Sequence, residues 1–436
     1  MEVFWAIISP IWAIFKAWWW VLLPIILWPR FLFMWIKWRQ DAYAKIVPSM
    51  LLELKMPAEV DRPFRAMEQV FAGFWMLYDP PDWWEKWWEG KYQIAMAIEV
   101  ISIGGDIHFY IRTPKALRNL IESSIYAQYP EVEITEAEDY TLKVPQDIPN
   151  KTWDMWGSDY EFIKPDIYPM KTYSRFFEES PAAKEEKRID PLASLLEGLA
   201  KVEPGEQIWV QIRIKPVTNA ENDYKDRTKK EVNKLVYRPD DSKNKARHFP
   251  LIKQALDVIL TGQPPADFKE KKEEGPMLPP EMKLTPGERE IVGQIEQKIS
   301  KVMFEGYIRF IILGERDKWH KANLKNILAF FANFNTENLN SFKPWSPSIT
   351  KIHKHELFFL NILFHDRKLY LRKRKLFRKY QQRLWYNYPK PDKTFILNLE
   401  ELATMFHIVG RAAVPSPMVQ RVEAKKAEPP INLPGN

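Results

Sequence analysis

Cysteine is absent from all 436 residues of the sequence. Disulfide bonds and cysteine-ligated metal centres are therefore excluded, and the chain fits a reducing compartment. Hydrophobic residues make up 46% of the chain, which excludes a wholly disordered protein. A chain of this length can form two or three domains with sizeable cores.

Motifs of the common enzyme classes are missing as well. The sequence contains no G-x-x-x-x-G-K-[ST] phosphate-binding loop, no G-x-S-x-G nucleophile motif and no G-x-G-x-x-G dinucleotide motif. The H-x-H pair at residues 353–355 has no H-E-x-x-H pattern or cysteine beside it, so it is a weak metal signal. We therefore expect a protein that is not an enzyme and that needs no metal or cofactor.

Tryptophan is the most unusual part of the composition. The chain has 19 tryptophans, of which eight lie in the first 38 residues and four more lie between residues 83 and 88. Tryptophan favours the headgroup region of bilayers, where its ring is buried and its N–H stays hydrated. We expect the membrane interface to be contacted by Trp18, Trp19, Trp20, Trp28, Arg30, Trp35, Trp38, Trp83, Trp84, Trp87 and Trp88. For the second cluster, an aromatic lid over a local core is the simpler interpretation, and a second membrane-surface anchor is the more specific one.

The first 40 residues form the expected membrane anchor. From Val3 to Ile36 only Lys16 and Arg30 are charged, and this run could supply the roughly 20 apolar residues that a spanning helix needs. Three prolines interrupt it, so a spanning helix would be kinked. A helix lying in the membrane plane stays open as an alternative, because a polar stripe would run along Ser9, Lys16, Arg30 and Lys37.

The rest of the chain reads as an α+β protein. Residues 41–90 are expected to form a helical, Trp-rich connector. In residues 91–216, two β-rich runs flank the turn Gly104–Asp106, a helix follows Pro114, and a short strand covers Val132–Thr135. This ββαβ order predicts a ferredoxin-like subdomain, with helices on one face of an antiparallel sheet.

A helix-then-strand unit occurs twice more, at residues 190–216 and 285–313. The second unit predicts another ferredoxin-like subdomain over residues 285–413. Residues 217–284 between them are a charged insertion followed by a linker rich in proline, lysine and glutamate. Residues 414–436 predict an extended tail.

Three sequence blocks carry a family resemblance. In order, they are R-x-P-K-A-L-R-N-L-I-E-S-S-I-Y-A-Q-Y-P, P-L-A-S-L-L-E-G-L-A and E-E-L-A-T-M-F-H, preceded in the last case by a short strand. Together they span roughly residues 90–436. This region resembles the part that precedes the motor domain in bacterial conjugation-type (type IV secretion) DNA-translocating ATPases. The family's nucleotide-binding residues have no counterpart here, so the resemblance implies a non-catalytic component that works with a separate P-loop ATPase.

A basic stretch covers residues 367–383. Nine of its seventeen residues are cationic, namely Arg367, Lys368, Arg372, Lys373, Arg374, Lys375, Arg378, Lys379 and Arg383. Tyr370, Phe377 and Tyr380 interleave with them, which is a pattern that can neutralise phosphates and stack on single-stranded bases. Anionic lipid headgroups are an equal alternative, and so is a solvated helix face that pairs with acidic neighbours.

We therefore expect a membrane-anchored scaffold of a conjugation-like or pilus-like translocation apparatus. More basic residues follow the anchor than precede it, which places the body on the cytoplasmic face of the bacterial inner membrane. The expected partners are membrane lipids, a separate P-loop ATPase and further copies of this chain. A membrane-tethered nucleic-acid-binding protein is the alternative.

Overall fold

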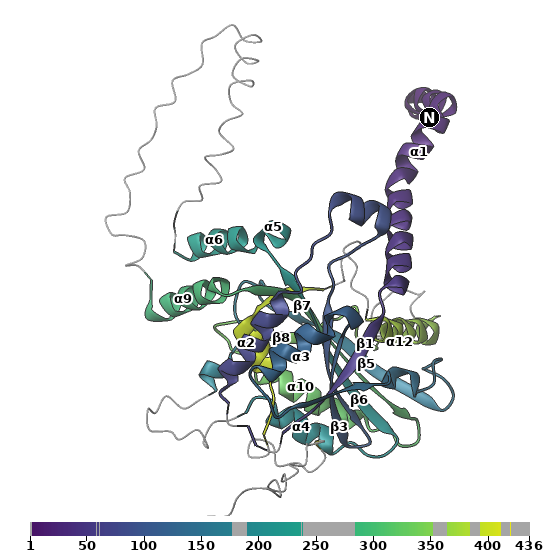
Figure 1. The fold of residues 1–436 in the computed structure, drawn as a ribbon. Helices are drawn as coiled ribbons and strands as arrows, with labels where there is room; N and C mark the ends of the chain where they lie inside the picture. Colours follow the sequence, from purple (N-terminus) through teal and green to yellow (C-terminus); the bar gives the residue numbers. More distant parts are fainter. Residues whose placement is uncertain are drawn as a thin grey trace, which may run out of the picture.

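One antiparallel sheet forms the body of the protein in the computed structural model (Figure 1). The structure describes residues 2–57, 59–60, 62–176, 190–236, 238, 284–351, 364–383, 393–410 and 419. Within these residues the sheet has nine strands, in the order β4-β1-β3-β2-β6-β7-β5-β8, with β9 also paired to β7. The strands are β1 (Ser49–Lys55), β2 (Met96–Ile103), β3 (Asp106–Pro114), β4 (Glu133–Ala137), β5 (Trp153–Phe162), β6 (Glu206–Val217), β7 (Met303–Glu315), β8 (Phe342–Pro344) and β9 (Phe395–Asn398).

The larger hydrophobic core lies on one face of the sheet. Alternate strand residues such as Ile98, Val210 and Phe310 point to this face and are buried, because successive side chains of a strand point to opposite sides. The helices that supply apolar residues to this core are α2 (Phe64–Trp75), α3 (Arg118–Tyr126), α4 (Ala193–Ala200), α10 (Leu324–Ala332) and α13 (Leu399–Met405).

A second core lies on the opposite face. Ile101, Trp209 and Ile311 point to this side, where they pack against α12 (His365–Gln382). A third, smaller cluster involves α6 (Tyr224–Leu235) and α9 (Pro286–Ser300) beside the ends of β6 and β7; α5 (Asn219–Asn222) precedes α6. The expectation of helices on one face only is therefore wrong, because the apolar residues of α12 cover the second face.

The two expected subdomains are a single continuous sheet. β6, from the first unit, and β7, from the second, pair along twelve residues, while β6 also pairs with β2 on its other side. Both strands are buried almost throughout. A fully buried strand leaves unpaired backbone groups if it ends a sheet, and pairing the two units satisfies those groups. The α+β class is thus confirmed, whereas the expectation of two small ferredoxin-like sheets is wrong, because the described strands form one nine-stranded sheet.

The connector over residues 41–90 is not helical throughout. Residues 49–55 form β1, which lies between β3 and β4. Its leucines are buried on both faces of the sheet, Leu52 and Leu54 in one core and Leu51 in the other. A short apolar run of this kind fits a buried strand and a helix equally well, so periodicity alone misassigned it.

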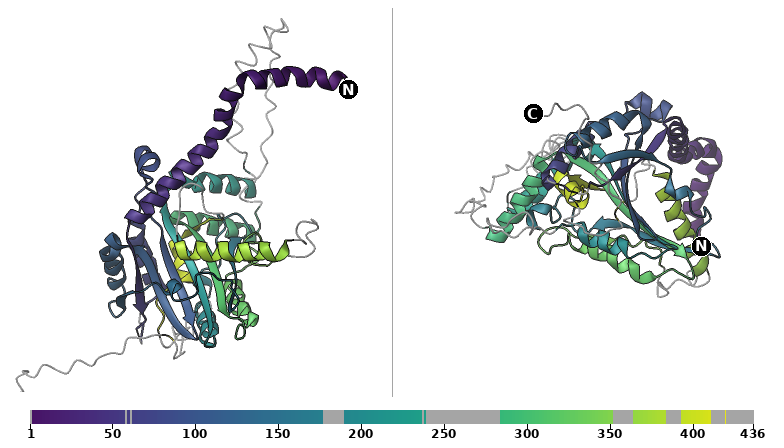
Figure 2. Two further views of the ribbon diagram at one scale, coloured as in Figure 1. Left: turned by 90° about the vertical axis from the view of Figure 1, so that its right-hand side faces the viewer. Right: turned by 60° about the horizontal axis from the view of Figure 1, so that its bottom comes forward.

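The N-terminal segment is one long helix, α1 (Glu2–Ile46), with Pro10, Pro24 and Pro29 inside it. Figure 2 shows that α1 rises away from the sheet and bends toward its N-terminus. The spanning helix expected over residues 1–40 is nevertheless not found: no helix in the described part of the chain combines the length and the apolarity needed to cross a membrane. Tryptophan, proline and basic residues interrupt its aliphatic run.

Most of the expected linker within residues 217–284 and of the tail at 414–436 lies outside the described residues. An exception in the tail is Val419, which is buried and forms an isolated parallel bridge with Ile107.

Candidate functional site

The nine basic residues of the 367–383 stretch do not share one environment. Lys373 donates to Asp154 over 2.6 Å and is buried, and Arg383 is buried in an ion-pair network. Arg372 donates to the backbone oxygen of Lys351 over 3.2 Å. Lys368, Arg374 and Lys379 are half-buried, which leaves the exposed positions to Arg367, Lys375 and Arg378.

The aromatic residues of the same stretch divide in a similar way. Phe377 and Tyr380 are fully buried against Trp209 of β6, with ring centroids 6.3 and 5.3 Å from it. Tyr370 is exposed. Two of the three expected stacking rings are therefore core residues of α12, and this overturns the prediction that they are available to bases.

Behind α12 lies a buried cluster of charges centred on Glu99 of β2. Arg383 donates Nε–H and Nη2–H to the Glu99 carboxylate over 2.6 and 2.9 Å, and donates Nη1–H to Asp139 over 2.6 Å. Arg112 of β3 donates to the same Asp139 over 2.9 Å. Tyr140 also donates to Glu99, over 2.7 Å. A bidentate guanidinium–carboxylate pair of this kind is among the stronger contacts in proteins.

These contacts shift the ionisation of the cluster. Burial alone would lower the pKa of Arg383, but the Glu99 charge holds it well above its usual value. Burial alone would raise the pKa of Asp139, but the hydrogen bonds and charge of Arg383 hold it below its usual value. For Arg112, burial and then the Arg383 charge lower the pKa. Arg383 and Asp139 are therefore both charged near neutral pH.

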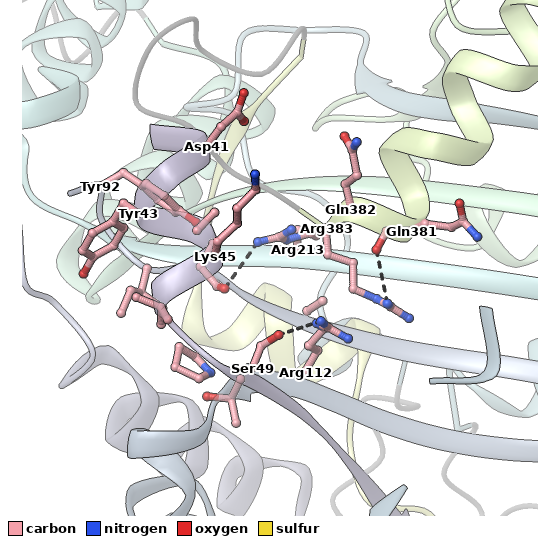
Figure 3. A pocket seen from close by; sticks show the side chains of 17 residues that line it. Asp41, Tyr43, Lys45, Ser49, Tyr92, Arg112, Arg213, Gln381, Gln382 and Arg383 are labelled. Atoms are coloured by element: carbon pink, nitrogen blue, oxygen red, sulfur yellow. Dashed lines mark hydrogen bonds between the residues drawn. The ribbon is translucent and has the colours of Figure 1, made fainter. Parts of the chain in front are cut away.

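A pocket of about 580 Å³ opens beside this cluster. Three parts of the fold form its walls (Figure 3). They are the last turns of α1, the neighbouring ends of β1, β2, β3 and β6, and the C-terminal end of α12. This volume is in the range of small-molecule sites. The charged side chains that line it are Asp41, Lys45, Arg112, Arg213 and Arg383.

Arg213 of β6 is the least satisfied of these residues. Its side chain is 3% exposed, and within the part of the chain that the structure describes it makes one hydrogen bond, a 3.3 Å donation from Nη2 to the backbone oxygen of Ala95. Its Nε and Nη1 atoms are buried without a hydrogen-bond partner. Burial lowers the pKa of Arg213, and the nearby charge of Glu99, which is not hydrogen-bonded to it in the described structure, offsets this only in part.

The tryptophan-rich segments meet on one side of α1. Residues Glu85–Glu89 form a single π-helical turn, η1. The indole of Trp35 donates to the backbone oxygen of Trp87 over 2.9 Å, and its ring stands edge-on to Trp88 at 5.9 Å. The two segments, 45 residues apart or more in sequence, therefore form one continuous aromatic cluster.

Much of this aromatic cluster faces solvent. Trp35 and Trp87 are half-buried, whereas the exposed members are Trp20, Trp28, Arg30, Trp38, Trp83, Trp84 and Trp88. The side chains of Trp18 and Trp19 lie outside the described residues. On the same helix, Ile25, Ile26 and Met34 are each more than 60% exposed. Such a contiguous apolar surface is unusual on an isolated soluble protein.

The pocket was missed by sequence reasoning, although a signal for it exists. Glu99 and Arg213 each interrupt an otherwise apolar strand, in M-A-I-E-V-I-S-I and I-W-V-Q-I-R-I-K-P. A charge inside a strand that is buried on both faces requires a partner or a ligand. The pairing across β2 and β6 was not foreseen, so these two charges were not brought together.

The chain was also compared with known proteins: no protein-family model matches it, and neither does any curated sequence. Within the described residues, no group of three His, Asp or Glu side chains is arranged to hold a metal ion.

Proposed function

We propose that this protein is a non-catalytic, membrane-associated scaffold of a translocation apparatus at the cytoplasmic face of the bacterial inner membrane. The observation that carries the proposal is the exposed apolar and aromatic surface of α1 and η1. An isolated helix that is apolar on most sides gains free energy only when another apolar phase covers it.

A lipid surface is the occupant that fits this residue pattern. The exposed tryptophans suit the headgroup region, and Arg30 and Lys37, exposed on the same helix, suit anionic lipids. A tilted helix that penetrates the bilayer and a helix that lies in its plane both place the body against the membrane.

The scaffold role follows from the resemblance to the pre-motor region of type IV secretion ATPases. The nine-stranded sheet would hold this region at a fixed height above the membrane, so that a separate P-loop ATPase could dock on it. Self-association is proposed on the same analogy, because such machines are commonly oligomeric.

Vesicle flotation of the full chain tests membrane association. We expect the protein to float with phosphatidylcholine vesicles, and a Trp28→Ser, Phe31→Ser, Trp38→Ser triple variant to lose most of the floating fraction. Leu142→Ser is the matched control, because Leu142 is 69% exposed and belongs to the body and not to α1 or η1. Equal flotation of the triple variant, or no flotation of the unaltered chain, would refute the proposal.

Affinity capture from bacterial membranes in mild detergent tests the partner. Recovery of a P-loop ATPase with this chain is expected. If repeated captures recover nucleic acid alone, the scaffold role is wrong and the alternative below gains support.

The alternative function is nucleic-acid binding, favoured by the exposed basic residues of α12. Arg367, Lys375 and Arg378 fall within about 80° of one helix face at 100° per residue. Replacing all three with glutamine should lower the affinity for single-stranded DNA and reduce its salt dependence, with a slope of about 0.7 per lost phosphate contact. A variant that binds DNA with an unchanged salt dependence would contradict this function.

A further inference from the structure

The pocket beneath α1 carries more positive than negative charge. Four cationic side chains line it, and three of them are the guanidinium groups of Arg112, Arg213 and Arg383. The nearby carboxylates are Asp139 and Glu99, which are bonded to Arg383 and Arg112, and Asp41 in the lining. One positive charge therefore remains without a carboxylate.

We assign this unbalanced positive charge to Arg213. Within the described residues, neither of the two carboxylates behind the pocket is hydrogen-bonded to Arg213, and two of its nitrogen atoms have no hydrogen-bond partner. The hydroxyl of Thr113, which also lines the pocket, is buried and unpartnered too. Buried donors without acceptors cost free energy comparable to a lost hydrogen bond each, and an unpaired buried charge costs more.

An anion in the pocket would remove this cost. Figure 3 shows Lys45, Arg112, Arg213 and Arg383 around the same pocket, which they line from α1, the sheet and the end of α12. Within the described residues, the 3.3 Å bond to Ala95 is the one hydrogen bond of the Arg213 guanidinium, which leaves its Nε–H and Nη1–H groups available to an anion in the pocket. A planar guanidinium suits a phosphate, whose oxygens can accept two parallel N–H bonds.

We propose that this pocket binds the phosphate group of an anionic ligand, with Arg213 supplying the counter-charge and Lys45 closing the mouth. Inorganic phosphate and a phosphate monoester carry at least one negative charge near neutral pH, which is enough to balance the single positive charge left over. The inference is independent of membrane association, although a lipid headgroup and a free phosphate compound can both supply this chemistry.

The position of the pocket fits a headgroup source. Lys45 lies seven residues beyond Trp38, which corresponds to about 10 Å along a helix. Each headgroup layer of a bilayer is roughly 5–8 Å thick. If the exposed tryptophans of α1 mark the interface, the pocket mouth lies at or just outside this layer.

The test measures the melting temperature of the full chain in detergent as inorganic phosphate is added, and its flotation on vesicles of phosphatidylcholine with and without phosphatidic acid. The central variant is Arg213→Met, which keeps a flexible, unbranched apolar stem while removing the charge and its hydrogen-bond donors. We expect at least a tenfold loss of the phosphate-dependent response in this variant. Without phosphate it should melt at the same or a higher temperature, because an unpaired buried charge has been removed.

Two further variants keep the test decisive. Lys45→Gln, at an exposed position on α1, should weaken the response without affecting folding, and Arg378→Gln, exposed on α12, should leave it unchanged. An Arg213-dependent response to inorganic phosphate indicates a free ligand, and one confined to phosphatidic acid vesicles indicates a headgroup. If Arg213→Met responds to both probes as the unaltered chain does, or if neither probe produces a response, the site does not exist. Flotation on pure phosphatidylcholine reports on membrane association alone, so the two proposals can fail separately.

Discussion

At the scale of single residues, charged side chains inside the sheet are the distinctive feature of this protein. Glu99 accepts hydrogen bonds from Arg383, Tyr140 and Gln211, and all four residues are buried. Elsewhere in the sheet, Arg309 of β7 donates to Asp159 of β5 over 2.6 Å. Buried ion pairs contribute little net stability when intact, but breaking one leaves an uncompensated charge.

Glu99→Ala is therefore expected to lower the free energy of unfolding by about 3 kcal/mol or more, because Arg383 loses its bidentate partner inside the core. Urea denaturation followed by circular dichroism measures the change. Glu138→Ala is the control, since the Glu138 side chain is 88% exposed, and it should stay within about 0.5 kcal/mol of the unaltered protein. A Glu99→Ala variant as stable as this control would show that the cluster does not stabilise the fold.

Asp139 is expected to make the free energy of unfolding depend on pH in the acid range. Arg383 holds its pKa in the folded state below its usual value, which is about 3.9 in an unfolded chain. Its contribution is therefore fully present above about pH 4 and is lost as the pH falls through the folded-state pKa.

Asp139→Asn should consequently show a shallower loss of unfolding free energy below about pH 4 than the unaltered chain. Urea titrations at a series of pH values from 7 to 3 measure this slope, with Glu138→Gln as the control for an exposed neighbour. Parallel slopes for Asp139→Asn and the unaltered protein would mean that the Asp139–Arg383 pair does not couple to folding.

The partners of individual charged side chains were also the part of the structure that the sequence predicted least well. The identity of each charge could be read, but its partner depended on long-range pairing. Lys373 and Arg383 were grouped with seven other cations, whereas one pairs with Asp154 and the other with Glu99 and Asp139. Charge density along a helix does not tell which of its side chains face a buried carboxylate.

At the scale of elements, the sequence predicted helices and strands correctly where turn or capping residues mark their ends. The β2–β3 hairpin turns at Gly104 and Gly105, both with positive φ, as the sequence predicted. The helix after Thr285 begins with proline and a complete capping box, and the strand and helix within residues 394–407 are present as β9 and α13. The prediction for residues 49–55 was wrong, because a short run of apolar residues has no periodicity that distinguishes a strand from a helix.

Helix α12 is expected to be held against the sheet by its apolar face. Phe377→Ala should destabilise the protein by about 3–5 kcal/mol, because it opens a cavity beside Trp209 in the second core. Tyr370→Ala, on the exposed face of the same helix, should cost less than about 0.5 kcal/mol. Chemical denaturation of both variants measures the difference. Equal effects would show that α12 is not anchored through its apolar face.

At the scale of the whole molecule, one sheet replaces the two subdomains that the repeated helix–strand pattern predicted. The pattern itself is real: α4 leads into β6 and α9 leads into β7. What it could not reveal is that these strands are each other's neighbours, since strand pairing is set by tertiary packing and not by local sequence.

A single sheet predicts a single cooperative unfolding transition of the body. Thermal unfolding followed in the far ultraviolet and by tryptophan fluorescence should give coincident curves, because β6 transmits any loss of β7 to β2. Trp209 lies between both halves and makes the fluorescence sensitive to their separation. Two resolved transitions would instead support independent subdomains.

The ion pair between Glu99 and Arg383 also has a consequence for synthesis. The two residues are 284 positions apart in sequence. At translation rates of about 5–20 residues per second, roughly 15–60 seconds separate their appearance. During that interval Glu99 lacks its partner Arg383, and one edge of β6 is unpaired until β7 has been synthesised. The N-terminal half of the nascent chain is therefore expected to remain a client of chaperones until the last helix of the second core leaves the ribosome.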